Sequence, residues 1–351
     1  MLLTLLLAQR ATQLPVVDLT GKPLVTIAEP VVQPNGFAEL PNHRAVIVDG
    51  KDNRIALVDF ARNSLTTLGR QGAGPVEYRH PMGAFAAPAG GAIVPDLGNR
   101  RAVLINAAGV ITGTGYTREE MGVGGAGQIR GVDRTGLVYL FGGLGNGDVG
   151  NRLPIVTWQP VSHHVDTIAW WPQVPVTHGP MRKSANGATT TELMTFAMFP
   201  PRTEWLMVTA GGIVKISPQP YHVEFIDSHG KSAIGPAVVR TPIPLDATER
   251  DAYRNQRGPI PDKDFPSQYP PFSGINDAFV APDSQVWVER SRRFADSTAV
   301  YDIFDRNGKL SAQARLRPNS HLVGIGRDMV YVVRQTTDDD FWYVEEWQRP
   351  H

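Results

Sequence analysis

Residues 69–81 read GRQGAGPVEYRHP and lie between two stretches of sequence that resemble each other. The stretch before them, residues 35–60, reads NGFAELPNHRAVIVDGKDNRIALVDF, and the stretch after them, residues 82–106, reads MGAFAAPAGGAIVPDLGNRRAVLIN. Four pairs of positions match at an offset of 47 residues: Gly36 and Gly83, Asp49 and Asp96, Arg54 and Arg101, and Val58 and Ile105. A period of this length, carried by short apolar runs between polar turns, is typical of a propeller blade or of a solenoid unit.

The same alternation of β-branched runs and turns continues through most of the chain, and it predicts short strands joined as a meander. Taken in order, the runs group into six units that begin near residues 37, 83, 137, 193, 278 and 322. The last unit is one strand short, and residues 15–27 (PVVDLTGKPLVTI) supply short runs ahead of the first unit. We therefore predict an all-β, six-bladed β-propeller of four-stranded antiparallel blades, closed by an N-terminal strand because closure protects strand edges.

One segment between the fourth and fifth units departs from this pattern. Residues 246–256 (DATERDAYRNQ) place Asp246 at a cap position and Glu249 three residues later, which predicts a short helix with a capping box. The Pro-rich residues 258–272 follow, and they cannot join a sheet interior because proline lacks the backbone donor. We interpret this segment as one long insertion on a rim of the propeller, since strands resume directly after it. A lid, a docking strap and a simple loop all fit its sequence.

The bulk composition excludes several classes of function. The 34 Lys and Arg residues balance 34 Asp and Glu residues, and without the basic stripe that nucleic-acid binders carry we expect no nucleic-acid partner. The chain has no cysteine, which excludes disulfides, thiolate metal sites and cysteine nucleophiles. Neither His-Glu-x-x-His nor Gly-x-Ser-x-Gly occurs in the sequence, so the common metalloprotease and serine-hydrolase motifs are missing too.

The first eight residues, MLLTLLLA, form an apolar run that is too short to span a membrane, which takes about 20 residues. We interpret residues 1–11 as the remnant of a signal peptide, with an ordinary first β-strand as the alternative, and residues 12–351 as a single propeller domain. No later stretch reaches membrane-spanning length. We therefore expect an extracytoplasmic protein, periplasmic or secreted, with no membrane span.

The turn at residues 49–60 (DGKDNRIALVDF) and the connector at residues 69–81 resemble the NHL-like six-bladed β-propellers. In that family an Asp-x-x-Asn-x-Arg type turn precedes a strand and a Gly-rich connector. The connector positions are held here by Gly74, Pro75, Glu77, Tyr78 and Pro81, with Val76 in place of a usual Gly. The late segments 269–289 and 300–310 look like the C-terminal blades of bacterial exported six-bladed β-propeller proteins. The resemblance covers blades one, two and five; it implies the fold and little about activity, because such propellers include binding scaffolds, lactonases and lyases.

Two sequence patterns have a structural explanation. The first consists of the repeated residues Asp49, Asn53 and Arg54, and Asp96, Asn99 and Arg101. A catalytic set is normally unique, whereas a polar residue that recurs in each blade usually fixes a turn through bonds to the backbone. The second is the G-x-G-x-x-G match within residues 122–131 (GVGGAGQIRG), which we interpret as an inter-blade connector because a turn and a strand, not a helix, are expected after it.

The best-placed polar residues for a site stand just before the innermost strand of each blade. In a propeller, the connectors that lead into these strands converge on one mouth of the central channel, where a rigid scaffold can carry a pocket. Five blades supply the candidates, which are Asn35, His80, Arg130, Asp277 and His321. Such residues either solvate a water-filled channel or bind a ligand, and both interpretations remain open.

The sequence thus favours a monomeric binding or interaction module over an enzyme, with an unidentified protein, small molecule or carbohydrate as its partner. We predict no cofactor and no metal site, because only Asp277 among the candidates is acidic. The alternative is a metal-dependent enzyme of the lactonase or lyase type, with its site at the central channel. A third possibility is a sugar-binding surface formed by Trp158, Trp170, Trp171 and Trp205, although such rings more commonly pack between blades.

Overall fold

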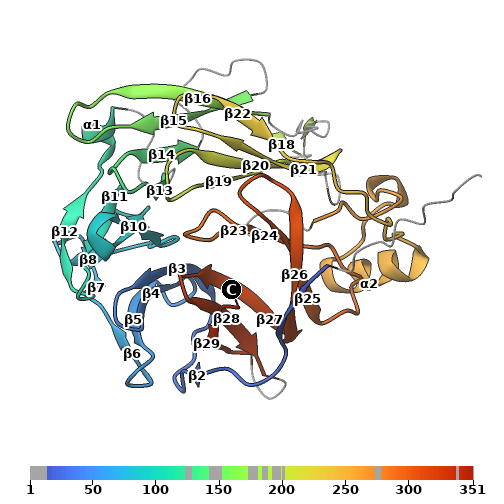
Figure 1. The fold of residues 1–351 in the computed structure, drawn as a ribbon, viewed down its shortest axis with the longest axis horizontal. Coiled ribbons are helices and arrows are strands. Elements are labelled where there is room, and N and C mark those ends of the chain that lie inside the picture. The colour runs from blue at the N-terminus through green and yellow to red at the C-terminus, as the bar shows by residue number, and fades with distance from the viewer. Residues whose placement is uncertain are drawn as a thin grey trace, which may run out of the picture.

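The computed structural model describes residues 14–122, 129–141, 152–172, 181–183, 189–191, 199, 202–272, 278–336 and 340–350. Its strands form six main sheets around a common axis (Figure 1). Blade one contains β3 (Pro34–Leu40), β4 (Arg44–Asp49), β5 (Arg54–Asp59) and β6 (Ser64–Thr67). Blade two contains β9 (Phe85–Ala86), β10 (Ala92–Asp96), β11 (Arg101–Ile105) and β12 (Ile111–Gly115). Blade three contains β13 (Ile129–Val132), β14 (Val138–Phe141), β15 (Arg152–Trp158) and β16 (Val165–Pro172).

The second half of the ring follows the same plan. Blade four contains β19 (Glu204–Met207), β20 (Ile213–Pro218), β21 (Tyr221–Ile226) and β22 (Ser232–Ile234). Blade five contains β23 (Ala278–Val280), β24 (Val286–Glu289), β25 (Thr298–Phe304) and β26 (Leu310–Pro318). Blade six contains β27 (Ser320–Ile325), β28 (Met329–Gln335) and β29 (Trp342–Gln348), with β2 (Val25–Thr26) as its fourth strand.

The innermost strands close the ring. β3, β9, β13, β19, β23 and β27 contact one another in that order, and β27 contacts β3. The second strands β10, β14 and β24 are buried along their whole length, because each blade is covered on both faces by its neighbours. This explains why they read as continuous apolar runs such as VYLF rather than as alternating ones. The predicted six-bladed β-propeller of four-stranded antiparallel blades is confirmed.

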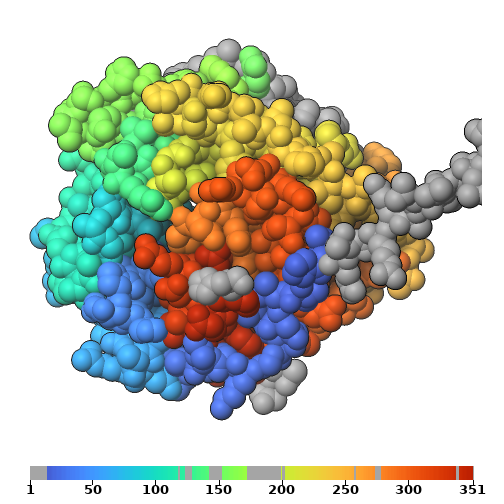
Figure 2. Space-filling view, viewed as in Figure 1, coloured from blue at the N-terminus to red at the C-terminus, as the bar shows by residue number. Residues whose placement is uncertain are grey.

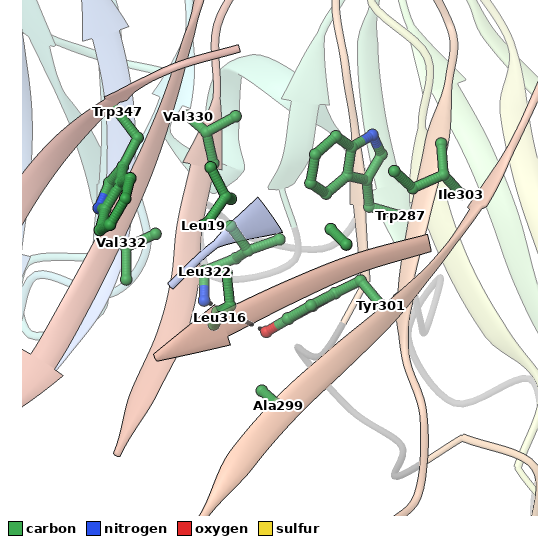
Figure 3. Packing of buried hydrophobic residues seen from close by; sticks show 11 residues of the cluster. Leu19, Trp287, Ala299, Tyr301, Ile303, Leu316, Leu322, Val330, Val332 and Trp347 are labelled. Atoms are coloured by element: carbon green, nitrogen blue, oxygen red, sulfur yellow. Dashed lines mark hydrogen bonds between the residues drawn. The ribbon is translucent and has the colours of Figure 1, made fainter. Parts of the chain in front are cut away.

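The N-terminal segment closes the ring with two strands, of which the prediction foresaw one. As expected, β2 pairs antiparallel with β29 and completes blade six. In addition, β1 (Val16–Leu19) pairs parallel with β26 and gives blade five a fifth strand. Figure 2 shows this blue segment lying against the orange and red C-terminal blades. Between blades five and six, Leu19 packs in a buried cluster with Trp287 and Trp347 (Figure 3), so the N-terminus holds both blades together.

The strand assignment in blades three and four corrects the prediction. The innermost strand of blade three, β13, lies partly inside the segment interpreted as a connector, residues 122–131. Its Gly131 looks like a turn residue, but a Cβ there would lie 2.3 Å from Met207 Cε and 3.2 Å from Met207 Cβ, so glycine favours the close approach of the next blade. In blade four the innermost strand is β19, not residues 193–199, of which only Phe199 is among the described residues.

The insertion between blades four and five carries the predicted helix, α2 (Ala247–Arg257), and Asp246 caps it by accepting a bond from Glu249 N at 3.1 Å. The second half of the predicted capping box, in which Glu249 would accept a bond from the backbone N–H of Asp246, is wrong. The Glu249 carboxylate is buried and accepts bonds from Tyr269 Oη at 2.6 Å and Phe294 N at 2.8 Å. It therefore fastens the insertion to the loop after β24. The insertion also has its own small core, formed by Leu245, Phe265 and Tyr269.

Minor elements complete the description. They are the strand pairs β7 (Arg70–Gln71) with β8 (Glu77–Tyr78) and β17 (Met181–Lys183) with β18 (Thr189–Thr191), the short helix α1 (Arg118–Met121), and 3₁₀ turns at Pro88–Gly90 and Asp262–Asp264. Among the described residues, no helix has the length and apolar character that crossing a membrane requires.

Candidate functional site

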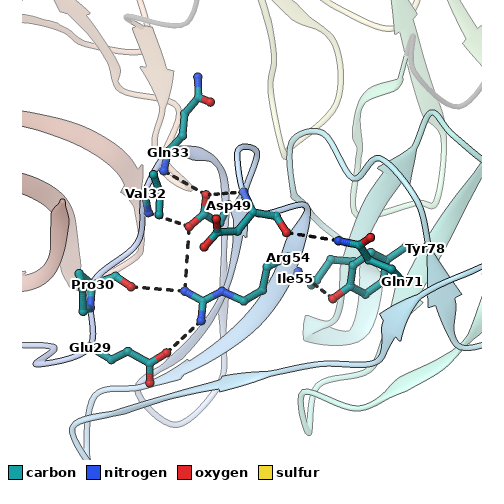
Figure 4. A network of polar contacts seen from close by, with 10 residues as sticks. Glu29, Pro30, Val32, Gln33, Asp49, Arg54, Ile55, Gln71 and Tyr78 are labelled. Atoms are coloured by element: carbon teal, nitrogen blue, oxygen red, sulfur yellow. Dashed lines mark hydrogen bonds and ion pairs between the residues drawn. The ribbon is translucent and has the colours of Figure 1, made fainter. Parts of the chain in front are cut away.

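Asp49, at the end of β4, fixes the connector that enters blade one (Figure 4). Its carboxylate is buried and accepts bonds from Val32 N at 2.7 Å and Gln33 N at 3.0 Å. Arg54 binds the same connector through Glu29 at 2.9 Å. The carboxylate therefore satisfies backbone amides that have no sheet partner, which is the usual structural use of such a residue.

Asp96 repeats this arrangement one blade later. It is fully buried and accepts bonds from Arg79 N at 3.0 Å and His80 N at 2.9 Å. Arg101 donates to the carbonyls of Ala73 at 3.0 Å and Glu77 at 3.2 Å. The repeated Asp and Arg residues thus bind backbone, as their repetition predicts, and they hold in place the connectors from which the mouth of the channel is built.

The five candidate residues share a position at the start of blades. Asn35, Arg130 and His321 are the second residues of β3, β13 and β27, and His80 lies in the connector before β9. Asp277 lies outside the described residues. Each blade is a meander of four strands, so all innermost strands run in the same direction and their first residues face the same end of the channel. The topology thus places the four described candidates around one mouth.

Asn35 and His80 meet at a single turn. Both side chains are exposed. A Cβ on Gly50 would lie 2.2 Å from Asn35 Nδ2, so the Asn35 amide packs directly over this turn of blade one. On blade two, His80 Nδ1 lies 3.0 Å from Asn53 Oδ1 of the same turn. The turn between β4 and β5 is therefore held between the two candidates, and it joins them into one polar surface.

His321 is supported from behind by a buried carboxylate. Its Nδ1 lies 3.6 Å from Glu289 Oε2, and its ring packs edge-on against Trp342 with 5.5 Å between ring centroids. Glu289 is buried and accepts a bond from Tyr301 Oη at 2.8 Å. Burial favours the neutral acid, but the contact with His321 and the charge of Arg292 outweigh it and lower the pKa of Glu289. The Glu289 carboxylate is therefore ionised at neutral pH and lies behind the His321 ring.

Arg130 faces a carboxylate that the sequence analysis missed. The Arg130 side chain is in contact with solvent, yet burial lowers the pKa of its guanidinium, and the negative charge of Glu204 opposes that shift. A cation that is surrounded by protein and still reaches water is the expected state of a group inside a channel mouth. Glu204 is the first residue of β19, at the same end of its blade as the other candidates. It was missed because the innermost strand of blade four was expected at residues 193–199.

The four tryptophans do not form one surface. Trp158 and Trp205 are buried and belong to two different core clusters. Trp171 packs against Phe141, and Trp170 is exposed beneath the guanidinium of Arg152, 5.5 Å from its ring centroid. The proposed sugar-binding surface is therefore wrong for Trp158 and Trp205, which pack between blades.

The donor groups of the described residues do not converge on a metal position. In the part of the chain that the structure describes, no three His, Asp or Glu side chains come close enough together to hold a metal ion. The groups at the mouth combine a nitrogen donor with a carboxylate, as in Arg130 near Glu204 and His321 beside Glu289. Such pairs suit hydrogen bonding to a polar or zwitterionic group.

Comparison with known proteins agrees with the fold. No family model and no curated protein matches the sequence. A Bacteroides fragilis protein described as exported has a similar structure, with a TM-score of 0.54, 9% identity, and coverage of 95% of this chain and 99% of that one. A Bacteroides vulgatus member of the DUF4221 family has a TM-score of 0.54 and 8% identity over 95% and 98% of the two chains. The calcium-binding protein regucalcin from Agrobacterium tumefaciens has a TM-score of 0.44 and 11% identity over 95% of this chain and 97% of that one. At such identities the likeness establishes the propeller fold alone.

Proposed function

We propose that this chain is an exported, monomeric propeller of the NHL-like kind, a single domain over residues 12–351, that binds a polar ligand at the mouth of its channel without transforming it. The observation that carries this proposal is the ring of polar groups around the end of the channel at which the innermost strands start. Blades three and four contribute Arg130 and Glu204, and blades five and six contribute Glu289 and His321. Groups of both signs on a rigid scaffold can orient a peptide or a carbohydrate.

Export is supported by the Bacteroides fragilis protein that shares the fold and is described as exported, and by the apolar run at residues 1–8. The preference for binding over catalysis rests on the donor set. An enzyme of the lactonase or lyase type would need several oxygen or imidazole ligands around the axis. The described residues offer a nitrogen donor beside a carboxylate there instead, and such an enzyme would have to recruit Asp277 together with further ligands from outside them.

The test is a binding screen by thermal unfolding, with a defined peptide and oligosaccharide library. A ligand at a hundredfold excess over its Kd stabilises the native state by about 2.7 kcal/mol, so hits are recognised by a raised Tm. We expect Arg130→Gln and His321→Gln to lose the response. Arg306→Gln, an exposed arginine in the turn between β25 and β26, is the matched control and keeps it.

Metal analysis of the purified protein decides between the two functions. A stoichiometric, tightly held ion, together with a large fall in Tm when chelator is added, would contradict the binding-module proposal and support the metal-dependent enzyme. A ligand response that survives both mouth substitutions would place the site elsewhere on the propeller.

A further inference from the structure

A second group of charged residues lies between blades four and five, where the insertion leaves the ring and rejoins it. At its centre is Asp302 of β25, which is fully buried. Its Oδ2 accepts a bond from Tyr221 Oη of blade four at 3.1 Å, and its Oδ1 accepts from Gln313 Nε2 at 3.4 Å and from Arg240 Nη2. Arg240 belongs to the start of the insertion, shortly after β22. The Asp302 carboxylate therefore already accepts three hydrogen bonds from within the fold.

Arg290 stands beside this cluster without a carboxylate of its own. Its backbone follows β24 and pairs with Phe272 at the end of the insertion, and its side chain is half-buried. Burial lowers the pKa of Arg290, and the positive charge of Arg240 lowers it further. Among the described residues, no acceptor lies within hydrogen-bonding distance of the Arg290 guanidinium, and no carboxylate lies within ion-pair distance.

Unlike Arg290, the arginines around it each pair with a carboxylate. Arg292 pairs with Glu289, and Arg293 pairs with Asp246 at 3.2 Å. Arg240 pairs with Asp302. Thus every other arginine of the RSRR segment, and the arginine next to it in space, has an anion within the fold. Among the described residues, Arg290 alone in this group has no hydrogen bond or ion pair of its own: Asp302 attracts it from beyond ion-pair distance, and Arg240 repels it.

The charge count indicates what is missing. Tyr221 stays neutral at pH 7, because burial and the nearby Asp302 raise its pKa well above the ordinary value. Burial also raises the pKa of Asp302, but Arg240 and Arg290 oppose this shift, so we count Asp302 as an anion. Two guanidinium groups and one carboxylate leave a single positive charge. One further monoanion balances it, whereas a phosphate dianion would overshoot.

The Nε of Arg240 is buried and has no hydrogen-bond partner, but Arg54, Arg101, Arg202, Arg250 and Arg317 share this feature. A buried N–H is also closed to solvent, so the argument for a ligand rests on the half-buried Arg290 guanidinium. A planar, singly charged group beside Arg240 would accept two hydrogen bonds from the Arg290 fork, and the carboxylate group has this geometry.

We propose that Arg290 and Arg240 form a binding site for the carboxylate group of an organic anion at the boundary of blades four and five. This site is separate from the proposed ligand site of the mouth, and it does not depend on Arg130 or His321. Its occupant would contact both ends of the insertion, since Arg240 follows β22 and Arg290 pairs with Phe272. Binding there would therefore stabilise the insertion against the ring.

The experiment measures Tm of the full chain at pH 7 in sodium propionate, sodium phosphate and sodium chloride at matched ionic strength. Because phosphate stabilises folded proteins in general, the response to a salt is the Tm of the wild type minus that of Arg290→Gln in the same salt, and we expect it to be largest in propionate. Arg290→Gln should weaken the apparent affinity for propionate by about tenfold or more, because a charged hydrogen-bonding partner is removed. Arg290→Lys, which keeps the charge and loses the fork, should retain only a small part of the response. Arg306→Gln removes one charge from an exposed turn of the same blade and should respond like the wild type.

A second readout separates binding from structural support. In chloride alone, Arg290→Gln should have a higher Tm than the wild type, since it relieves the repulsion with Arg240; functional sites commonly carry such a cost. A lower Tm for Arg290→Gln in chloride would show that Arg290 supports the fold, and it would overturn the proposal. So would an equal response to propionate and chloride, or a response to phosphate alone.

Discussion

The connectors into blades two and five both lead into an innermost strand, but they differ in how far the fold bonds their polar and charged groups. The connector into blade two is short, and the fold satisfies its polar groups: Asp96 accepts two of its amides and Arg101 donates to its carbonyls. The insertion into blade five is long and has its own helix and core, and Arg290 beside it has no hydrogen bond or ion pair within the described part of the chain. A connector whose polar groups are bonded within the fold has few groups left to bind a ligand. An insertion with a core of its own can leave a charged side chain beside it unpaired.

The comparison predicts that the short connector depends on the ring far more than the insertion does. Asp96→Ala should be the most damaging of the substitutions considered, with a loss of about 4 kcal/mol in the free energy of unfolding, because it leaves buried amides without an acceptor. Urea denaturation measures this loss. Asp96→Asn keeps one acceptor oxygen and should lose less, and the exposed Asp52→Ala is the control. A loss below about 1 kcal/mol for Asp96→Ala would mean that water replaces the carboxylate.

The N-terminal strands allow the same comparison at the point where the ring closes. Leu19 is 3% exposed and packs between blades five and six, whereas Val16 on the same strand is 52% exposed. We expect Leu19→Ala to lower the free energy of unfolding by about 3 kcal/mol through lost burial and a cavity, and Val16→Ala to change it little. Equal effects of the two substitutions would show that β1 does not fasten the two blades.

The insertion should respond weakly and locally to the loss of its main polar contact. Tyr269→Phe removes the hydroxyl that donates to the buried Glu249 carboxylate at 2.6 Å. We expect a loss of about 1.5 kcal/mol, seen as faster amide exchange in α2, with little change in the core strands of the ring. Tyr116→Phe, on a tyrosine whose ring packs against Trp158, is the control. Faster exchange throughout the ring would show that the insertion and the propeller unfold as one unit.

These differences also explain what the sequence could predict. The six units and the closing strand were predictable because each blade repeats short apolar runs, and because residues 15–27 supplied the strand that blade six lacked. The innermost strand of blade three was not, since its Gly131 serves a contact with Met207 that only the neighbouring blade creates.

The sequence predicted only where a site could lie. The start of each innermost strand follows from the meander, and this rule gave Asn35, Arg130 and His321 as candidates. Their partners come from other blades or other strands: Glu204 for Arg130, and Glu289 for His321. Likewise, Tyr221, Arg240 and Asp302 are far apart in the chain and meet only after the ring has formed. Pairings of this kind have no local sequence signal.

The smallest expected effect is a difference in how the stability contributed by Glu77 and by Asp302 depends on pH. In the short connector, the bond from Gly74 N and the contact with Arg70 lower the pKa of Glu77 below its ordinary value of 4.5. Glu77 therefore contributes stability above that value and loses it as the pH falls through the pKa of the folded protein. At the insertion, burial raises the pKa of Asp302 above its ordinary value of 3.8, although Arg240 and Arg290 oppose the shift. Asp302 therefore contributes stability below that value, and this contribution is lost as the pH rises through the folded-state pKa.

Two substitutions separate these opposite linkages. Relative to the wild type, Glu77→Gln should be less stable at about pH 6, and the deficit should shrink toward about pH 3.5. Asn at position 302 resembles the protonated acid, so Asp302→Asn should be more stable relative to the wild type at about pH 6 than at about pH 3.5. Urea denaturation across this range measures both trends. Trends of the same sign for the two variants would contradict the distinction, because the fold would then treat the negative charges of Glu77 and Asp302 alike.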